Sequence, residues 1–240
     1  MSAYEQLTAW CRTLEHPGAT IAPPDGWQFA VLDPARSRRA AVLVLFGEAD
    51  VMRPSGEKQV GARGPAADGG RDLDHEQLDL LFVMRASTLS NHPGQVAFPG
   101  GSIDDADADE VGAALREAEE ETGLDATGVD VLGCLPEVGL PVSNFMVTPV
   151  LAWWREQSAV RAVDAAESQV VFRCPVSTLL TADNRRTAVL RRDGFVSRTP
   201  AFITPDAVIW GFTAMLLDAI FDGLGWTRAW DRSLEIPAPL

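Results

Sequence analysis

Three glutamates near the middle of the chain have the residue type and spacing to hold a metal ion. On a helical wheel, Glu120 lies about 60° to one side of Glu117 and Glu121 about 40° to the other, while Glu119 points away towards solvent. Because like charges at these spacings destabilise a helix, their clustering makes physical sense where a hard cation binds among them. Since no Cys or His lies nearby, oxygen ligands alone predict Mg²⁺ or Mn²⁺.

A second interpretation of this run needs no ligand, because a glutamate-rich stretch is usually a solvated helix face. The residues around the run favour a site instead. A short strand runs into Pro99-Gly100-Gly101, an acidic loop follows, and Arg116 then precedes the glutamates. The glycine pair allows a close backbone approach, and Gly123 is the usual left-handed residue at a helix end.

The same segment resembles the Nudix box, G-x5-E-x7-R-E-U-x-E-E-x-G-U, in which U is aliphatic. The second half of the pattern matches at Arg116, Glu117, Ala118, Glu120, Glu121, Gly123 and Leu124. The first half differs, because Ala108 stands at the position of the first Glu counted back from Arg116, and Asp107 is its acidic neighbour. The gap between Gly101 and Arg116 is one residue longer than in the standard box.

This departure resembles the coenzyme A diphosphatase branch of the Nudix superfamily, whose box carries Asp residues and the extra loop residue. The branch has an upstream signature that ends in G-Q-V-A-F-P-G-G, and residues 85–101 (RASTLSNHPGQVAFPGG) follow it closely. Residues 141–150 (PVSNFMVTPV) and 209–214 (IWGFTA) are also similar to that branch. The resemblance covers roughly residues 38–222.

The resemblance implies hydrolysis of a nucleoside diphosphate linked to another group. Mg²⁺ or Mn²⁺ bound by Glu117, Glu120 and Glu121 would bridge the diphosphate, lower the pKa of bound water and stabilise the leaving phosphate. For coenzyme A, in-line attack by water gives 3′,5′-ADP and 4′-phosphopantetheine. One carboxylate also orients or deprotonates the water, and the sequence leaves open which one. Arg116 is expected to support the site by bridging to a neighbouring carboxylate and holding the loop.

The residues implied on the substrate side come mainly from the upstream signature. They are Arg85, Ser90, His92, Gln95, Gly100 and Gly101. Further carboxylates have open roles: Asp104 and Asp107 order the loop, contact a water next to the metal ligands, or cap the helix. Asp164 and Glu167 are the candidates for a distal carboxylate that assists the metal ions or the base.

The elements that must position these residues follow from apolar periodicity and from breaking residues. Strands are predicted at 40–46, 78–85, 95–98, 129–135, 146–154, 169–174, 187–192 and 195–198, and helices at 3–15, 108–122 and 206–221. Asp193-Gly194 predicts a hairpin between the last two strands. The order predicts an α/β fold with a mixed sheet between helices, which the resemblance makes a Nudix α/β/α sandwich. The domain boundaries are predicted as 1–37 (N-terminal helix and arm), 38–222 (Nudix domain with a flexible insertion at 53–74) and 223–240 (tail).

Composition limits the partners of the 240-residue chain. With 34 acidic and 20 basic residues, the net charge of −14 argues against nucleic acid and anionic membranes as partners. A small anionic nucleotide would need a bound cation to offset the repulsion. Three cysteines without a CxxC motif predict reduced, buried thiols. No apolar run approaches ~18 residues and no signal peptide is recognisable, so a cytoplasmic protein is expected.

Two other functions stay open at this point. One is a Nudix hydrolase of another nucleotide, such as NADH, ADP-ribose or a nucleoside triphosphate. The other is a non-catalytic ligand-binding Nudix module, although such modules tend to lose box carboxylates that are intact here. The sequence also leaves open whether the protein is a homodimer, and whether the N-terminal arm and the 53–74 insertion make dimer contacts, cover the substrate or do neither.

Overall fold

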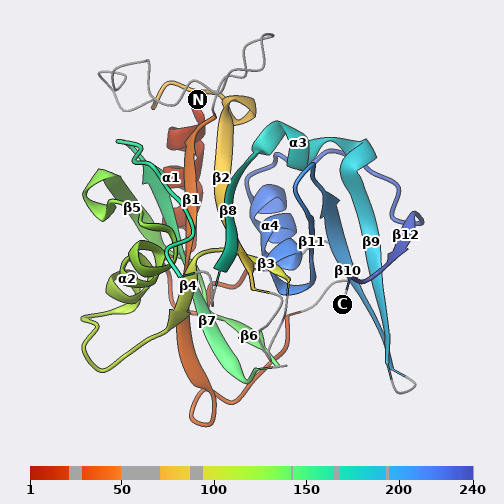
Figure 1. Ribbon diagram of the computed structural model, residues 1–240, viewed down its shortest axis with the longest axis horizontal. Helices are drawn as coiled ribbons and strands as arrows, with labels where there is room; N and C mark the ends of the chain where they lie inside the picture. Colours follow the sequence, from red (N-terminus) through yellow and green to blue (C-terminus); the bar gives the residue numbers. More distant parts are fainter. Residues whose placement is uncertain are drawn as a thin grey trace.

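The larger of two sheets is built around two parallel strands. The computed structural model describes residues 1–21, 29–49, 71–86, 94–141, 143–164, 168–192 and 195–239. The strands of the larger sheet are β1 (Arg38–Glu48), β2 (Leu78–Arg85), β3 (Val96–Ala97), β4 (Gly100–Ser102), β5 (Val129–Cys134), β6 (Val138–Leu140), β7 (Phe145–Trp154) and β8 (Ser168–Pro175). They follow the order β3-β2-β1-β7-β5, while β4, β6 and β8 pair with β1, β7 and β2 (Figure 1). Since β1 and β7 run parallel and β1 and β2 antiparallel, the sheet is mixed, as predicted.

Strand β1 marks the middle of this sheet because it is buried on both faces. Side chains alternate across a strand, so a run buried on both sides reads as continuously apolar. One face consists of Ala41, Leu43 and Leu45, and the other includes Val44 and Phe46. The apolar run at 40–46 therefore becomes the centre of the sheet.

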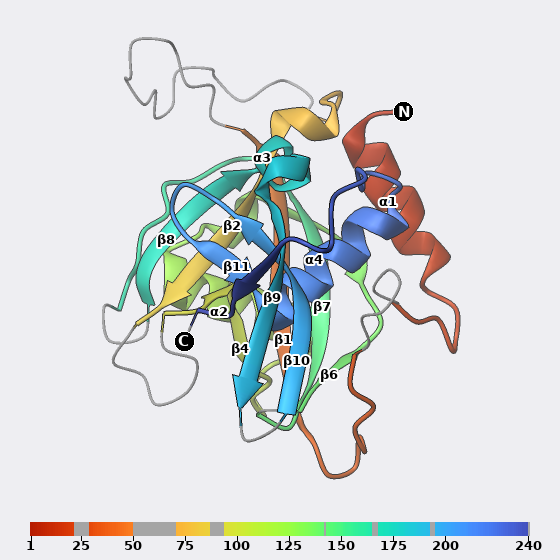
Figure 2. The ribbon, with the colours of Figure 1, turned by 90° about the vertical axis from the view of Figure 1, so that its right-hand side faces the viewer.

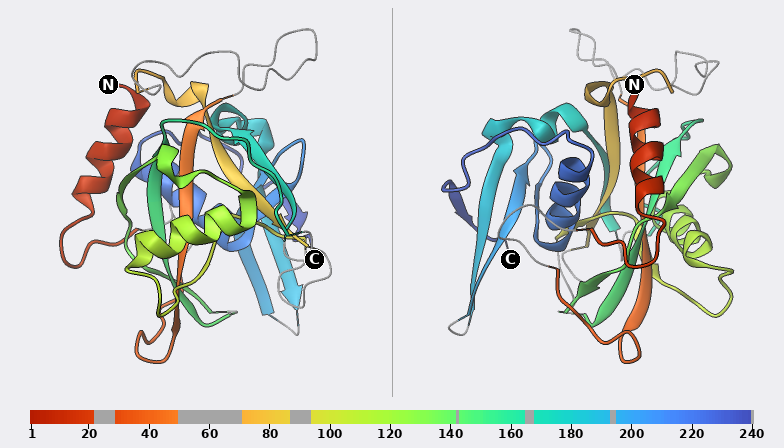
Figure 3. Two further views of the ribbon diagram at one scale, coloured as in Figure 1. Left: turned by 60° about the vertical axis from the view of Figure 1, so that its left-hand side comes forward. Right: turned by 180° about the vertical axis from the view of Figure 1, so that it is seen from behind.

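Helices cover both faces of the larger sheet. Helix α2 (Glu110–Thr122) packs on one face, and α1 (Ala3–Thr13) and α4 (Gly211–Gly223) contribute to the core on the other (Figure 3). This arrangement is the predicted α/β/α sandwich. No helix in the described parts of the chain is long and apolar enough to cross a membrane.

A second, smaller sheet lies beyond α4. Its strands are β9 (Arg185–Arg192), β10 (Phe195–Ile203), β11 (Val208–Trp210) and β12 (Glu235–Pro237), in the order β11-β10-β9-β12. Figure 2 shows β9 and β10 in front of α4, and Figure 1 shows α4 between the two sheets. The short helix α3 (Val176–Leu180) connects β8 to this sheet, and single turns of 3₁₀ helix lie at His75–Gln77, Ala126–Gly128 and Ala182–Asn184.

The last helix begins later than its apolar pattern predicts. The sequence analysis placed a helix at 206–221, but residues 208–210 form β11, and α4 begins only at Gly211. Val208 and Ile209 are β-branched and suit a strand. Gly211 has a φ of 65°, so the chain turns there between the strand and the helix.

The residues after α4 pack back on the fold. Trp226 is buried, its ring meets Phe46 edge-on at 5.9 Å, and its Nε1 donates to Oε1 of Gln6 in α1 at 2.7 Å. Farther along, β12 pairs with β9 in parallel. The tail at 223–240 thus joins α1 to the main core and extends the second sheet.

A buried ion pair joins the second sheet to α4. The side chains of Arg185 in β9 and Asp218 in α4 form this pair and are 1% and 0% exposed. The guanidinium of Arg185 lies 4.1 Å from the ring centre of Phe202 and 4.6 Å from that of Trp230. Burial raises the pKa of Asp218, although Arg185 opposes the shift.

Several sequence predictions concern other parts of the chain. Most of the arm after α1 and most of the 53–74 insertion lie outside the described residues. Cys11 and Cys174 are buried free thiols, as expected, but Cys134 is exposed. Cys134 ends β5, and the expectation that all three thiols are buried is therefore wrong.

Candidate active site

Two glycines at the start of β4 meet two of the predicted metal ligands. Gly100 and Gly101 pair with Val42 and Ala41 of β1. The N–H of Gly100 donates to Oε2 of Glu121 at 3.1 Å. A Cβ on Gly101 would overlap the carboxylate of Glu117. The glycine pair therefore brings both carboxylates against the edge of the sheet.

Helix α2 presents these glutamates between two well-defined ends. Its first residue is Glu110, two residues after the predicted start, because Asp109 caps the helix by accepting from the N–H of Gly112 at 2.8 Å. It ends as predicted at Gly123, which has a φ of 67°. The N-cap preference for Asp is a sequence signal that includes Asp109 among the candidates for this cap.

Arg116 contacts most of the acidic groups in this region. Its Nη1 donates to Oε1 of Glu117 at 3.0 Å and to Oε2 of Glu120 at 3.1 Å. Its Nε and Nη2 donate to the two carboxylate oxygens of Asp107 at 2.9 and 3.0 Å, a two-pronged contact that guanidinium geometry favours. Nη2 also donates to the carbonyl of Ser102 at 3.2 Å. Arg116 thus holds the acidic loop against the helix.

Asp107 orders the acidic loop, one of the three roles that the sequence left open. One of its oxygens also accepts from the N–H of Asp104 at 2.8 Å. The contact with Arg116 lowers the pKa of Asp107 to about 2. Helix capping, another of these roles, belongs to Asp109. The shorter Asp side chain, set one residue farther from Arg116 than the box pattern has its Glu, still reaches the guanidinium.

The three glutamates differ in exposure. The side chain of Glu120 is 60% exposed and that of Glu117 20%, and Glu121 is buried. Burial raises the pKa of Glu117, and Arg116 opposes the shift. Glu119 is exposed, as predicted. The donors are all carboxylate oxygens, which suits a hard cation. Among the described residues, however, no three His, Cys, Asp or Glu side chains already form a ready metal cluster.

The substrate-side residues are only partly described. Arg85 ends β2, and its N–H donates to the carbonyl of Gln95 at 3.0 Å. The Nε of Arg85 is buried and, within the described chain, has no hydrogen-bond partner. Ser90 and His92 lie outside the described residues.

The candidates for a distal carboxylate lie after β7. The N–H of Val163, next to Asp164, donates to the backbone carbonyl of Glu121 at 3.2 Å. The backbone before Asp164 therefore lies at the end of α2. Glu167 falls outside the described residues.

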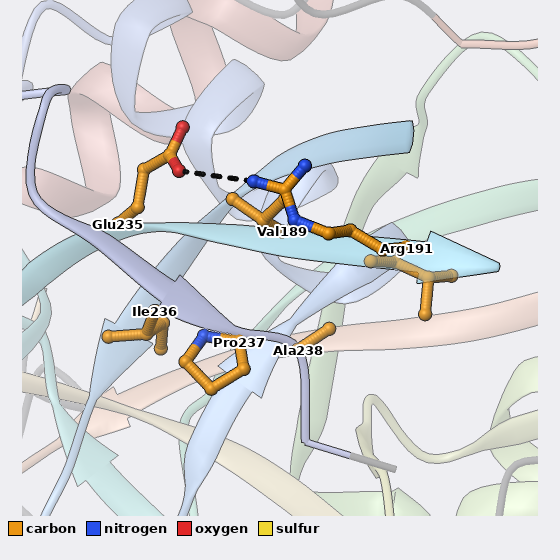
Figure 4. Close-up of a pocket in the computed structure, with 7 residues that line it drawn as sticks. Val189, Arg191, Glu235, Ile236, Pro237 and Ala238 are labelled. Atoms are coloured by element: carbon orange, nitrogen blue, oxygen red, sulfur yellow. Dashed lines mark ion pairs between the residues drawn. The ribbon is translucent and has the colours of Figure 1, made fainter. Parts of the chain in front are cut away.

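A groove on the second sheet is separate from these carboxylates. It has a volume of about 430 Å³ and is lined by Val189, Leu190, Arg191, Glu235, Ile236, Pro237 and Ala238 (Figure 4). Arg191 and Glu235 form an ion pair across it at 3.9 Å. Its lining comes from β9 and the β12 region and includes no residue of the box.

Alanine at Gly100 and alanine at Gly101 are expected to differ in their effect on stability. In Gly101→Ala, the new methyl group meets the flexible end of Glu117, so the carboxylate moves while the fold persists. We expect a loss of activity of at least about tenfold with little change in the melting temperature. In Gly100→Ala, the methyl group meets the backbone of Ala41 and Val42, and the φ of 154° adds strain, so stability falls as well. Thermal melts with activity assays check both variants, and a large loss of stability in Gly101→Ala would contradict this account.

Comparison with known proteins places the chain in a family. A family model described as NUDIX domain matches residues 69–193. A protein named as the uncharacterized Nudix hydrolase NudL from Enterobacter sp. (strain 638) is 35% identical over 167 residues, which are 70% of this chain and 86% of that protein. A protein of the same name from Cronobacter sakazakii is 38% identical over 138 residues, 58% of this chain and 71% of that protein. A solved NUDIX hydrolase from Nitrosomonas europaea is 12% identical with a TM-score of 0.44, covering 89% of this chain and 85% of that one. The family match and the identity to NudL show that the chain belongs to the Nudix family.

Proposed function

We propose that this protein hydrolyses the diphosphate bond of coenzyme A or its derivatives with the help of Mg²⁺ or Mn²⁺, releasing 3′,5′-ADP and 4′-phosphopantetheine. The observation that carries the proposal is the meeting of Glu117 and Glu121 with the glycine pair of β4, with Arg116 beside them. Membership of the Nudix family supports a diphosphate of the nucleotide type as substrate.

Carboxylates of α2 would hold the cation in this mechanism. Glu117, Glu120 and Glu121 are the proposed ligands, and a bound divalent ion supplies charge neutralisation and a water of lowered pKa. Arg116 fixes Glu117 and the acidic loop in place. Exposed Glu120 would be able to turn towards the cation, since its contact with Arg116 is at the surface.

The proposal for coenzyme A depends on the stretch at 85–101. Arg85 stands at the end of β2 with a buried Nε that lacks a partner among the described residues, as suits a phosphate-binding arginine. The carbonyl of Gln95 accepts from its N–H, and Gly101 lets the carboxylate of Glu117 come against the backbone of β4. The related NudL proteins are named as uncharacterized, so the choice of coenzyme A is supported by the resemblance of residues 85–101 to the coenzyme A diphosphatase branch.

A product assay tests the proposal. The purified protein is incubated with coenzyme A, NADH, ADP-ribose or dGTP, each with Mg²⁺ or Mn²⁺, and the products are identified by mass. Selective release of 3′,5′-ADP and 4′-phosphopantetheine is expected. Turnover of another nucleotide would retain the metal site and reject coenzyme A, and no turnover of any of them would favour a binding module.

A further inference from the structure

The segment between β7 and β8 is attached to the end of the box helix. The N–H of Arg161 donates to the carbonyl of Thr122 at 2.9 Å, and the N–H of Val163 donates to that of Glu121 at 3.2 Å. These bonds satisfy two of the last carbonyls of α2, which have no partner within the helix. The backbone of Arg161 is therefore fixed beside the end of α2 that carries Glu120 and Glu121.

The side chain of Arg161 is exposed and unpaired. Among the described residues it makes no ion pair, hydrogen bond or ring contact, whereas Arg116, Arg155 and Arg185 all bind carboxylates. A free guanidinium is notable in a chain of net charge −14. One structural explanation is that it offsets the negative end of the α2 dipole, because the last turn of α2 contains no basic residue.

A second arginine is linked to the same region by a short stretch of chain. In the pairing of β8 with β2, Ser168 is opposite Arg85. Ser168 comes five positions after Val163, so the two residues are at most about 18 Å apart. Arg85 and Arg161 are thus tied to the two ends of this connection. Since a guanidinium binds phosphate oxygens in pairs, two such groups suit a substrate with more than one phosphate.

We propose that Arg161 binds a phosphate of the nucleotide substrate and thereby sets its affinity. The proposal rests on the proposed function, because it requires a nucleoside diphosphate as the substrate. It assigns Arg161 a direct contact with a phosphate oxygen, whereas the box carboxylates would bind the cation. In coenzyme A this group is either the 3′-phosphate or the diphosphate itself. Dephospho-coenzyme A, which lacks the 3′-phosphate, distinguishes the two.

Steady-state kinetics of Arg161→Gln test the proposal. We expect KM for coenzyme A to rise about tenfold and kcat to stay within about twofold, because a charge-assisted contact made in both ground and transition state is lost. Arg161→Lys should recover part of the affinity. An unchanged KM for dephospho-coenzyme A in Arg161→Gln would assign the contact to the 3′-phosphate, and a rise for both substrates would assign it to the diphosphate.

Arg12→Gln is the matched control, since Arg12 is an exposed arginine in the last turn of α1 and the charge change is the same. If the two variants have the same KM, and Arg161→Gln has the lower melting temperature, the proposal is overturned. Arg161 would then only stabilise the C-terminal end of α2. If wild-type protein does not hydrolyse coenzyme A, the proposed function fails independently. Calorimetric binding of 3′,5′-ADP then tests Arg161: weaker binding by Arg161→Gln supports the proposal, and equal binding by the variant and the wild type rejects it.

Discussion

Replacing Glu121 by Gln is expected to reduce kcat by about a hundredfold or more while leaving the fold intact. Glu121 is buried, and its Oε2 accepts from the N–H of Gly100. The amide oxygen of Gln can keep that hydrogen bond, so the change mainly removes a negative charge that the proposed cation requires. Loss of a group that merely orients a metal ligand already lowers metal affinity or activity by about 10–100-fold. Loss of a ligand should lower them at least as much. Activity, circular dichroism and calorimetric titration with Mn²⁺ provide the measurements.

Glu119→Gln is the matched control for this experiment. It removes the same charge from the same helix, but Glu119 is exposed, and the one hydrogen bond of its side chain to the described residues comes from the backbone N–H of Ala126, at 3.3 Å. We expect its activity to stay within about twofold of wild type, as for most surface substitutions. Unchanged activity and unchanged Mn²⁺ affinity in Glu121→Gln would reject the assignment of Glu121 as a ligand.

Asp218→Asn is expected to lower the free energy of unfolding by about 3–5 kcal/mol. Asn is nearly the same size as Asp, so no cavity forms. The loss arises because the guanidinium of Arg185 stays buried between Phe202 and Trp230 without its counter-charge. Urea unfolding at neutral pH measures the effect, and Asp222→Asn, on an exposed position of the same helix, is the control.

A double variant separates the cost of an unpaired charge from the value of the pair. Arg185→Met with Asp218→Leu replaces both charges by apolar groups. We expect it to recover most of the lost stability, since apolar replacement of a buried pair is often neutral or stabilising. A double variant as unstable as the single one would show that the contact itself, including the aromatic faces around Arg185, supplies the stability.

The box helix could be predicted from the sequence because its signals are local. Gly123 marked the end of α2, and periodicity separated buried Ala114 and Ala118 from exposed Glu119. The start was displaced because Asp104, Asp105, Asp107 and Asp109 are all suitable caps, and only the fold selects Asp109.

Contacts that depend on distant pairing could not be predicted in this way. The position of Glu117 over Gly101 depends on β4 pairing with β1, which lies far earlier in the chain. The hairpin of β9 and β10 was recognised from its turn, but nothing local indicates that it joins a separate sheet against α4. Residues 208–210 were assigned to a helix because an apolar run of three residues fits either period.

The hydrogen bond between Trp226 and Gln6 has a consequence for the order of folding. Helix α1 is synthesised before Trp226, so its polar anchor does not yet exist when α1 leaves the ribosome. Trp10 of α1 likewise packs closely on Gly223, at the end of α4. Contacts between residues so far apart in sequence form slowly because a long loop must close first. Helix α1 therefore completes its docking only after α4 and Trp226 have been synthesised, and until then its apolar face is available to a chaperone.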